Sequence, residues 1–389
     1  MRDHYEISKF LSINSGLDLY GQGGNTFESS WKTPKEIKEY LDKHVVGQHK
    51  AKEVLATAIY NRDMRLFNRD SAPDGVAIDK SNIMMLGPTG CGKTYLIKTL
   101  AKCLNVPYAI EDATTFTSSG YIGRDVPDML DRLLSSAITM CPYDPLATSE
   151  VNSLRVKRMA ESGIIYLDEI DKLARPPNSQ GSKGVGDVEV QEELLKLLEG
   201  SIVQMGGVKS MHKNQGASGE LNIKEIDTTH ILFVIGGSFY GIEEIIARRL
   251  EGSCIGYNTP VHSKEKNLNI LHCAKTEDLV TFGMLPELVG RFAIQVSFSA
   301  LTERDLVHIL TGVTNNLIAQ YCKLLAYSSR HIIFSRRALK RIATLAIKSR
   351  TGARGLKRIL DASLQKTMFE APSDPNGPII YINADNITE

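Results

Sequence analysis

Two segments of the chain combine residue types and spacing that suit phosphate chemistry, and the first is GPTGCGKT at residues 87–94. It fits the pattern GxxxxGK[ST], and it lies between a short apolar run and an amphipathic segment. Glycines let successive backbone N–H groups turn towards one point, and the start of the following helix adds positive potential. In such a loop Lys93 would reach the β- and γ-phosphates of a nucleotide, and the Thr94 hydroxyl would bind Mg²⁺.

The second segment, GIIYLDEIDK at residues 163–172, is an apolar run that ends in acids. The carboxyl ends of buried parallel strands meet at one edge of a sheet, where ligands of α/β proteins bind. We expect Asp168 to hold Mg²⁺ through water and Glu169 to orient and activate the attacking water. Many strands end in solvated acids, so the segment is weak evidence by itself. Its place in the same strand pattern as the phosphate loop favours the catalytic interpretation.

The elements that must position these residues alternate along the chain from Ile83 onward. Short apolar runs such as IMML, VPYAI and HILFVI are separated by longer amphipathic segments such as YLIKTLAKCL and VQEELLKLLEG. This alternation predicts buried parallel strands flanked by helices, an α/β fold. Ahead of it, Thr33-Pro34 predicts a helix start, because Thr is a common N-cap and Pro suits the first helical position.

The pattern also predicts the domain organisation. Residues 1–30 end in a Gly/Ser/Asn-rich stretch that is typical of a leader or linker. Residues 31–296 would form the large α/β domain. Residues 297–389 would form a smaller, mainly α domain with short β-like runs at 331–334 and 378–382. Two Gly/Ser/Lys-rich stretches, 176–187 and 206–219, predict exposed, mobile loops in the large domain.

Composition narrows the classes of function. The 389 residues contain 46 Lys and Arg against 45 Asp and Glu, so no bulk positive charge favours a nucleic-acid partner. The 42% hydrophobic content is typical of a folded chain and not of a disordered one. The six cysteines are scattered without a CxxC pair, which suits reduced thiols in the cytoplasm and predicts no zinc. No apolar run reaches the roughly 20 residues of a membrane-spanning helix, and no signal peptide is recognisable.

Taken with their flanking segments, the two motifs resemble the AAA+ ATPases, and in particular the ClpX family of hexameric, ATP-driven protein unfoldases that feed the ClpP peptidase. The resemblance covers roughly residues 31–370. It rests on TPKEIKEYLDKHVVGQ, KSNIMMLGPTGCGKT, DATTFTSSGYIG, IIYLDEIDK, ELLKLLEG, FGMLPELVGRF and TGARGLKRIL. It implies an AAA+ P-loop fold with a small C-terminal domain like that of ClpB, ATP and Mg²⁺ as ligands, a homohexamer, unfolded or tagged protein substrates, and a ClpP-type peptidase partner.

The resemblance also implies a nucleotide site. HVVGQ at residues 44–48 matches the family's adenine-side motif, so Val45, Val46 and Gln48 would lie near the base. Arg354 in GARG matches the sensor-2 arginine, which contacts the nucleotide within the same subunit. The residue at the sensor-1 position, near the end of HILFVIGGSF, is left open. The phosphate loop would be formed by Pro88, Thr89, Gly90, Cys91, Gly92, Lys93 and Thr94.

Two further residues would act only in a ring. Arg291 in PELVGRF matches the arginine finger, which reaches the γ-phosphate bound by a neighbouring subunit and stabilises charge in the transition state. Tyr121 in GYIG matches the loop that projects into the central channel of the hexamer. There the aromatic side chain of Tyr121 would grip the substrate chain.

The chain departs from the family pattern in the segments through which the family binds substrates and partner proteins. The CxxC pairs of the family's N-terminal zinc-binding domain are missing. The peptidase-docking tripeptide Ile-Gly-Phe is replaced by Ile255-Gly256-Tyr257, and Tyr adds a hydroxyl that must stay hydrated or bonded. The basic Arg-Lys-His loop is replaced by VKSMHKN. Arg124 stands where the family usually has Glu, and we expect this reversed charge to alter which chains enter the channel.

Three functions remain open. The leading one is an unfoldase that delivers substrates to ClpP. The alternative is a chaperone or remodeller that works without a peptidase. A nucleic-acid motor is the third, and the neutral charge and the aromatic channel loop count against it. The related unfoldase HslU carries a large insertion between the two motifs, for which this chain has no room.

Overall fold

The computed structural model of the chain describes residues 32–67, 78–116, 124–175, 185–211, 220–252, 270–373 and 379–388. Residues Thr33–Glu389 form one unit and Met1–Lys32 another, and every element below belongs to the first. No helix in these described ranges is both long and apolar enough to cross a membrane.

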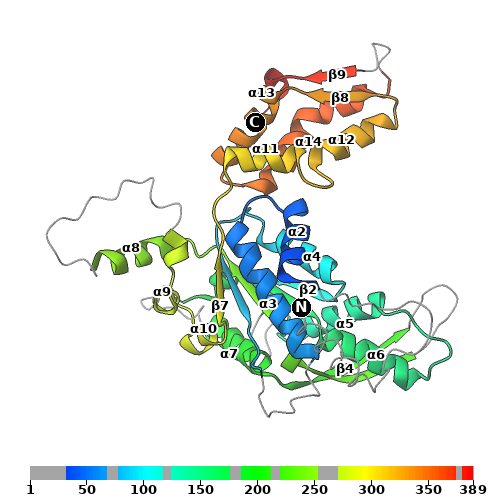
Figure 1. Ribbon diagram of the computed structural model, residues 1–389, viewed down its shortest axis with the longest axis vertical. Helices are drawn as coiled ribbons and strands as arrows, with labels where there is room; N and C mark the ends of the chain where they lie inside the picture. The colour runs from blue at the N-terminus through cyan, green and yellow to red at the C-terminus, as the bar shows by residue number, and fades with distance from the viewer. Residues whose placement is uncertain are drawn as a thin grey trace, which may run out of the picture. The chain divides into compact units, whose positions relative to one another are not determined.

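A five-stranded parallel sheet forms the centre of the large domain, with the strand order β2-β3-β6-β1-β7 (Figure 1). All four neighbouring pairs are parallel, which confirms the predicted sheet. The carboxyl ends of the strands therefore share one edge, where Asp112 is aligned with Asp168. The strands are β1 (Ile83–Leu86), β2 (Tyr108–Asp112), β3 (Ile164–Asp168), β6 (Leu232–Gly237) and β7 (Ile294–Ser297).

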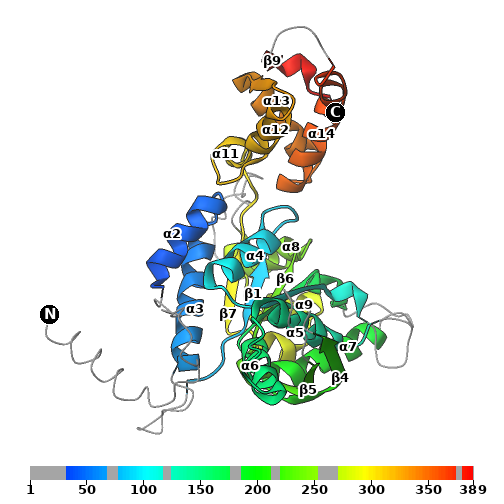
Figure 2. The ribbon, with the colours of Figure 1, turned by 90° about the vertical axis from the view of Figure 1, so that its right-hand side faces the viewer.

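Helices cover both faces of this sheet (Figure 2). Successive side chains of a strand point to opposite faces, so Ile83 and Met85 pack with α2, α3 and α4, whereas Met84 and Leu86 belong to the core on the side of α5, α6 and α7. Burial on both faces explains the near-continuous apolar runs of the strands. The helices are α2 (Pro34–His44), α3 (His49–Phe67), α4 (Lys93–Leu104), α5 (Asp128–Met140), α6 (Ser149–Glu161), α7 (Val185–Glu199), α8 (Ile242–Gly252), α9 (Thr276–Phe282) and α10 (Pro286–Gly290).

The start of α2 is the one that the sequence predicts. Thr33 is the N-cap and Pro34 is the first helical residue. The Thr33 hydroxyl accepts a hydrogen bond from the Glu36 N–H, and the Glu36 carboxylate accepts one from the Thr33 N–H at 2.7 Å. This reciprocal capping box satisfies two N–H groups that have no partner inside the helix.

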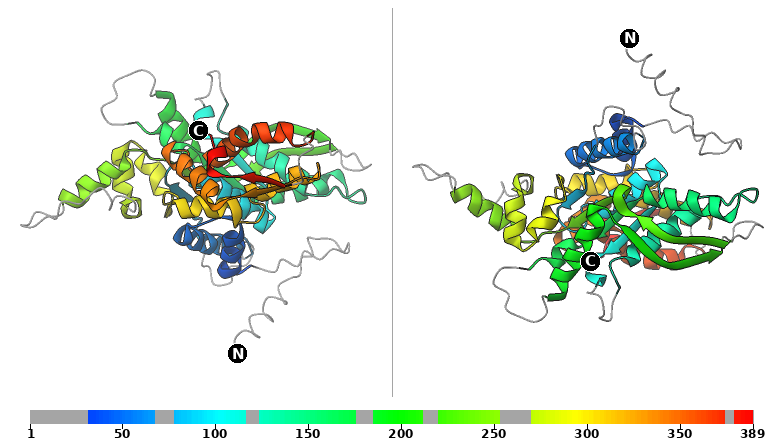
Figure 3. Two further views of the ribbon diagram at one scale, coloured as in Figure 1. Left: turned by 90° about the horizontal axis from the view of Figure 1, so that it is seen from above. Right: turned by 90° about the horizontal axis from the view of Figure 1, so that it is seen from below.

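One predicted loop is partly a strand. Residues 206–211, predicted as loop, belong to β4 (Ile202–Met211), which pairs antiparallel with β5 (Glu220–Asp227) beside α6 (Figure 3). The register shifts between Gln204 and Val208, where the two glycines lie: three residues of β4 stand opposite one residue of β5, as in a large β-bulge. Glycine in the interior of a strand often marks such an irregularity, which is why a glycine-rich stretch can be part of a strand and not of a loop. The other predicted loop, 176–187, is wrong at its end, because residues 185–187 begin α7; residues 176–184 and 212–219 lie outside the described residues.

The C-terminal part is a small, mainly helical domain, as predicted. Its helices pack around one apolar cluster that includes Leu306, Ile342 and Leu360. The two predicted β-like runs pair with each other in parallel as β8 and β9. The elements are α11 (Glu303–Thr311), α12 (Leu317–Ala326), β8 (His331–Phe334), α13 (Arg336–Lys348), α14 (Ala353–Glu370) and β9 (Ile379–Ile382).

Candidate functional site

The loop between β1 and α4 has the backbone of an anion cradle. Gly90 and Gly92 have φ angles of +78° and +102°, which favour glycine. α4 begins at Lys93, and its N-cap Gly92 has no side chain that could satisfy the first N–H groups of the helix. These N–H groups and the positive end of the helix dipole therefore suit an anionic ligand.

Lys93 lies folded against this loop. Its side chain is buried, and Nζ donates hydrogen bonds to the carbonyl oxygens of Gly87 at 2.5 Å and Pro88 at 3.2 Å. Neutral carbonyl oxygens therefore hold the ammonium group beside the loop, where a phosphate ligand would bind.

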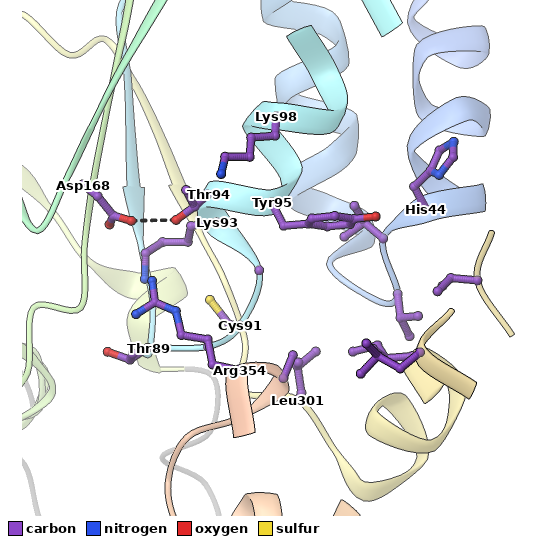
Figure 4. Close-up of a pocket in the computed structure, with 18 of the residues that line it drawn as sticks. His44, Thr89, Cys91, Lys93, Thr94, Tyr95, Lys98, Asp168, Leu301 and Arg354 are labelled. Carbon is purple, nitrogen blue, oxygen red and sulfur yellow. Dashed lines mark hydrogen bonds between the residues drawn. The ribbon is translucent and has the colours of Figure 1, made fainter. Parts of the chain in front are cut away.

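Asp168 lies at the carboxyl end of β3, opposite the start of α4 (Figure 4). The Thr94 hydroxyl donates a hydrogen bond to its Oδ2 at 2.6 Å, and the Tyr166 hydroxyl donates to Oδ1 at 3.1 Å. Burial, followed by the Asp168 carboxylate, raises the pKa of Tyr166 well above its usual value, so Tyr166 remains a donor. A hydroxyl and a carboxylate oxygen in contact are hard ligands of the kind that Mg²⁺ prefers.

Glu169 follows Asp168 in an unusual conformation. Its φ and ψ of 58° and 30° are left-handed, which is uncommon for a residue with a side chain. Such conformations are found at functional sites, where the surrounding structure maintains them. The turn carries Glu169 into the wall of the cavity that Thr94 and Asp168 also line.

This cavity, of about 600 Å³, has a lining of mixed polarity. The phosphate loop contributes polar groups, and Val45 and Val46 contribute apolar side chains together with residues of the small domain. The volume and the mixed lining suit a nucleotide. The apolar residues from the small domain are Leu301, Ile309, Val313 and Leu317.

Two of the predicted nucleotide-binding residues do not line this cavity. The Gln48 amide bonds the backbone of Ser299 twice: Nε2 donates to the carbonyl at 2.7 Å, and Oε1 accepts from the N–H at 3.0 Å. Gln48 thereby ties the HVVGQ turn to the segment that leads into the small domain. Pro88 contributes its carbonyl oxygen to Lys93 and no side chain to the described wall.

The small domain touches the phosphate loop directly. The N–H of Ala353, the first residue of α14, donates to the Gly90 carbonyl oxygen at 3.1 Å. A Cβ on Gly90 would lie 2.3 Å from the Thr351 carbonyl oxygen, so this close approach requires glycine. The next residue, Arg354, lines the cavity.

Arg291 lies outside this cavity, at the end of α10. Its guanidinium pairs with Glu199 at the end of α7, and its carbonyl oxygen accepts from Asn82 Nδ2 at 3.3 Å. Half of the side chain is exposed. Within one chain Arg291 therefore does not share the cavity wall that Asp168 and Glu169 line.

The sequence left the sensor-1 position open, and the structure brings Ser238 into the cavity wall there. Ser238 follows the last residue of β6, and its hydroxyl and N–H donate to the Asp171 carboxylate at 2.9 and 3.1 Å. The available signal was a polar residue directly after a buried strand. Sequence reasoning also missed His44, Tyr95, Lys98, Lys172, Asn315, Asn316 and Gln320, which line the same cavity.

Tyr121 and the tripeptide Ile255, Gly256 and Tyr257 lie outside the described residues. Within the part of the chain that the structure describes, no group of three or more His, Cys, Asp or Glu side chains is arranged to hold a metal ion.

Comparison with known proteins agrees with the fold and the motifs. Residues 78–295 match the AAA domain (Cdc48 subfamily), and residues 301–377 match the C-terminal, D2-small domain of ClpB protein. The chain is 41% identical over 357 residues to the ATP-dependent Clp protease ATP-binding subunit ClpX of Treponema denticola, with 90% of this chain and 80% of the relative covered. It is 38% identical over 359 residues to the proteins of the same name from Borrelia duttonii and Borrelia recurrentis, with 91% and 78% covered. The chain belongs to the ClpX family of AAA+ ATPases.

Proposed function

We propose that the chain is an ATP-driven protein unfoldase that works as a homohexameric ring, threads unfolded or tagged proteins through the ring and delivers them to a ClpP-type peptidase. One observation carries this proposal. The hydrogen-bonded pair of Thr94 and Asp168 lies beside a phosphate loop that the small domain contacts through Ala353. A nucleotide at this place would touch both domains, so its hydrolysis could move one against the other.

The chemistry is assigned to residues of the cavity wall. The loop N–H groups and Lys93 would bind the phosphates of ATP, and Glu169 would orient a water molecule and accept its proton. Thr94 and Asp168 would hold Mg²⁺, which neutralises developing charge on the phosphates. Val45 and Val46 would pack against the base.

Domain coupling is assigned to the start of α14. Arg354 would bind the phosphates, while Ala353 holds the loop through the Gly90 carbonyl oxygen. Loss of the γ-phosphate would remove a partner of Arg354 and leave the backbone contact in place. The small domain would then turn about that contact.

Ring assembly is assigned to Arg291. Its place outside the cavity that Asp168 and Glu169 of its own chain line, and its half-exposed position, support a role beside a neighbour's nucleotide. Assembly would break the Arg291–Glu199 pair and transfer the guanidinium to the γ-phosphate. Tyr121 would grip the substrate in the channel of the same ring.

Peptidase docking is assigned to Ile255, Gly256 and Tyr257, since an apolar anchor can enter a hydrophobic pocket of a partner. We place the activity in the cytoplasm, with proteins and not nucleic acids as substrates. If the tyrosine hydroxyl prevents docking, the chain would act as a remodeller of protein complexes without a peptidase.

A folded fluorescent reporter with a recognition tag tests the proposal. The purified chain, ATP and ClpP should cause a loss of fluorescence together with fragments of the reporter. Deletion of residues 254–258 should keep unfolding but abolish fragments, whereas Tyr121→Ala should abolish both. Unfolding without fragments in the unaltered protein would favour the remodeller, and DNA-stimulated ATP turnover without unfolding would contradict both functions.

A further inference from the structure

Glu111 is the second-to-last residue of β2, and its buried carboxylate has two arginine partners. Its side chain is 2% exposed, with Arg124 Nη1 at 3.4 Å from Oε2 and Arg132 Nε at 2.8 Å from Oε1. Burial raises the pKa of Glu111, and the charge of Arg124 opposes this change. A buried carboxylate is costly unless it is paired, and the two arginines supply that pairing.

The two arginines reach Glu111 from different parts of the chain. Arg132 belongs to α5. Arg124 directly follows residues 117–123, the segment that contains Tyr121 and lies outside the described residues. A β-bridge joins Phe116 to Arg124, and the Arg124 N–H donates to the Thr115 carbonyl oxygen at 3.4 Å. The two flanks of the segment are therefore held together, and one of them is fixed to Glu111.

Glu111 also lines a cavity with residues of the proposed hydrolysis site. β2 pairs with β3 in a register that aligns Glu111 with Leu167 and the next residue, Asp112, with Asp168. Glu111, Arg124 and Arg132 line a second cavity, of about 670 Å³, together with Asp168, Glu169 and Arg354. The ion pair and the proposed catalytic carboxylates thus share one wall.

We propose that Glu111 is a positioning residue that couples the Tyr121 segment to ATP hydrolysis through its ion pair with Arg124. This inference rests on the proposed function, in which Tyr121 meets the substrate. It changes the expectation for Arg124, whose charge is paired with Glu111 instead of being free to select substrate chains. A force that the substrate exerts on the segment would be transmitted to Arg124 and, through the ion pair, to Glu111 and β2. From β2 it would reach the paired strand β3, which ends in Asp168.

Stimulation of ATP turnover by an unfolded protein tests this coupling. We would compare turnover with and without reduced, carboxymethylated lactalbumin for the unaltered chain and for Glu111→Gln, Arg124→Gln, the double variant and Arg132→Gln. The last is the matched control, because it removes the same charge from the same carboxylate without altering the flank of the segment. Melting temperatures would identify variants that do not fold.

The unaltered chain should be stimulated, and Glu111→Gln and Arg124→Gln should each lose most of the stimulation while basal turnover stays within about twofold. The double variant should be no worse than either single variant, since residues acting through one contact are not additive. Arg132→Gln should remain stimulated. Equal loss in Arg132→Gln, additive losses in the double variant, or full stimulation of Arg124→Gln would overturn the inference. Absence of stimulation in the unaltered chain would contradict the proposed function as well.

Discussion

The Thr94 hydroxyl donates a hydrogen bond to Asp168 Oδ2 at 2.6 Å and so joins the helix after the phosphate loop to the strand that carries the acidic pair. The two residues lie 74 positions apart in the chain. A hydrogen bond to a charged group contributes about 1.5–3 kcal/mol. The contact therefore holds the two motifs against each other.

Removal of this hydroxyl should impair ATP hydrolysis. We expect Thr94→Ala to lower turnover at least tenfold and to raise the Mg²⁺ concentration needed for half-maximal rate, because one oxygen ligand is lost. Thr94→Ser keeps the hydroxyl and should retain most of the activity. Magnesium titrations of ATP turnover measure both effects, and equal behaviour of the two variants would argue against a role for the hydroxyl.

Gly90 and Gly92 allow a comparison between two glycines with positive φ. A Cβ on Gly90 would collide with the backbone of Thr351, whereas a Cβ on Gly92 would meet nothing within 4 Å. Both alanine variants carry a backbone penalty of about 1 kcal/mol, but only Gly90→Ala should also displace the small domain. Without nucleotide, its melting temperature should fall further than that of Gly92→Ala. Equal melting temperatures would show that the contact of α14 with the loop is dispensable.

Arg291 should act only on a neighbouring subunit. Arg291→Ala and Glu169→Gln should each be nearly inactive as pure rings. A mixed ring contains some sites in which one subunit supplies Glu169 and its neighbour supplies Arg291, so mixing the two variants should restore part of the ATP turnover. If mixing restores nothing while mixed rings form, as judged by a mass-tagged subunit, Arg291 does not act across the interface.

Lys80 should make stability depend on pH. Burial, followed by the charge of Arg65, lowers the pKa of Lys80 from 10.5 to about 7, while its Nζ donates to the Thr228 carbonyl oxygen at 3.0 Å. Between pH 7 and 10 the unfolded chain therefore binds more protons at this site than the folded chain, so the contribution of Lys80 to the free energy of unfolding rises with pH. Lys80→Met should remove this rise.

Urea denaturation at pH 7 and pH 9 measures the difference between the two proteins. The free energy of unfolding of the unaltered chain should increase relative to that of Lys80→Met as the pH is raised. A constant difference between the two proteins would place the pKa of Lys80 near its ordinary value in both states.

The sequence predicted what depends on local pattern. The phosphate loop, the strand ending in Asp168 and the capped start of α2 are each encoded by adjacent residues, and the structure contains all three elements. Gln48 and Ser238 could not be placed because their partners, Ser299 and Asp171, depend on how distant segments pack. The part of the cavity wall that the small domain supplies could not be predicted for the same reason. Leu301 and Leu317 are ordinary apolar residues in the sequence, and only the packing of the two domains places them at the cavity.

The central claim is that Glu169 activates water for ATP hydrolysis at this site. The most direct test is to measure ATP binding and ATP turnover of Glu169→Gln beside the unaltered chain. Loss of a general base typically lowers a rate 10²- to 10⁴-fold, so turnover should fall by about this factor while the Kd for ATP changes by less than threefold. Near-normal turnover by Glu169→Gln would contradict the account.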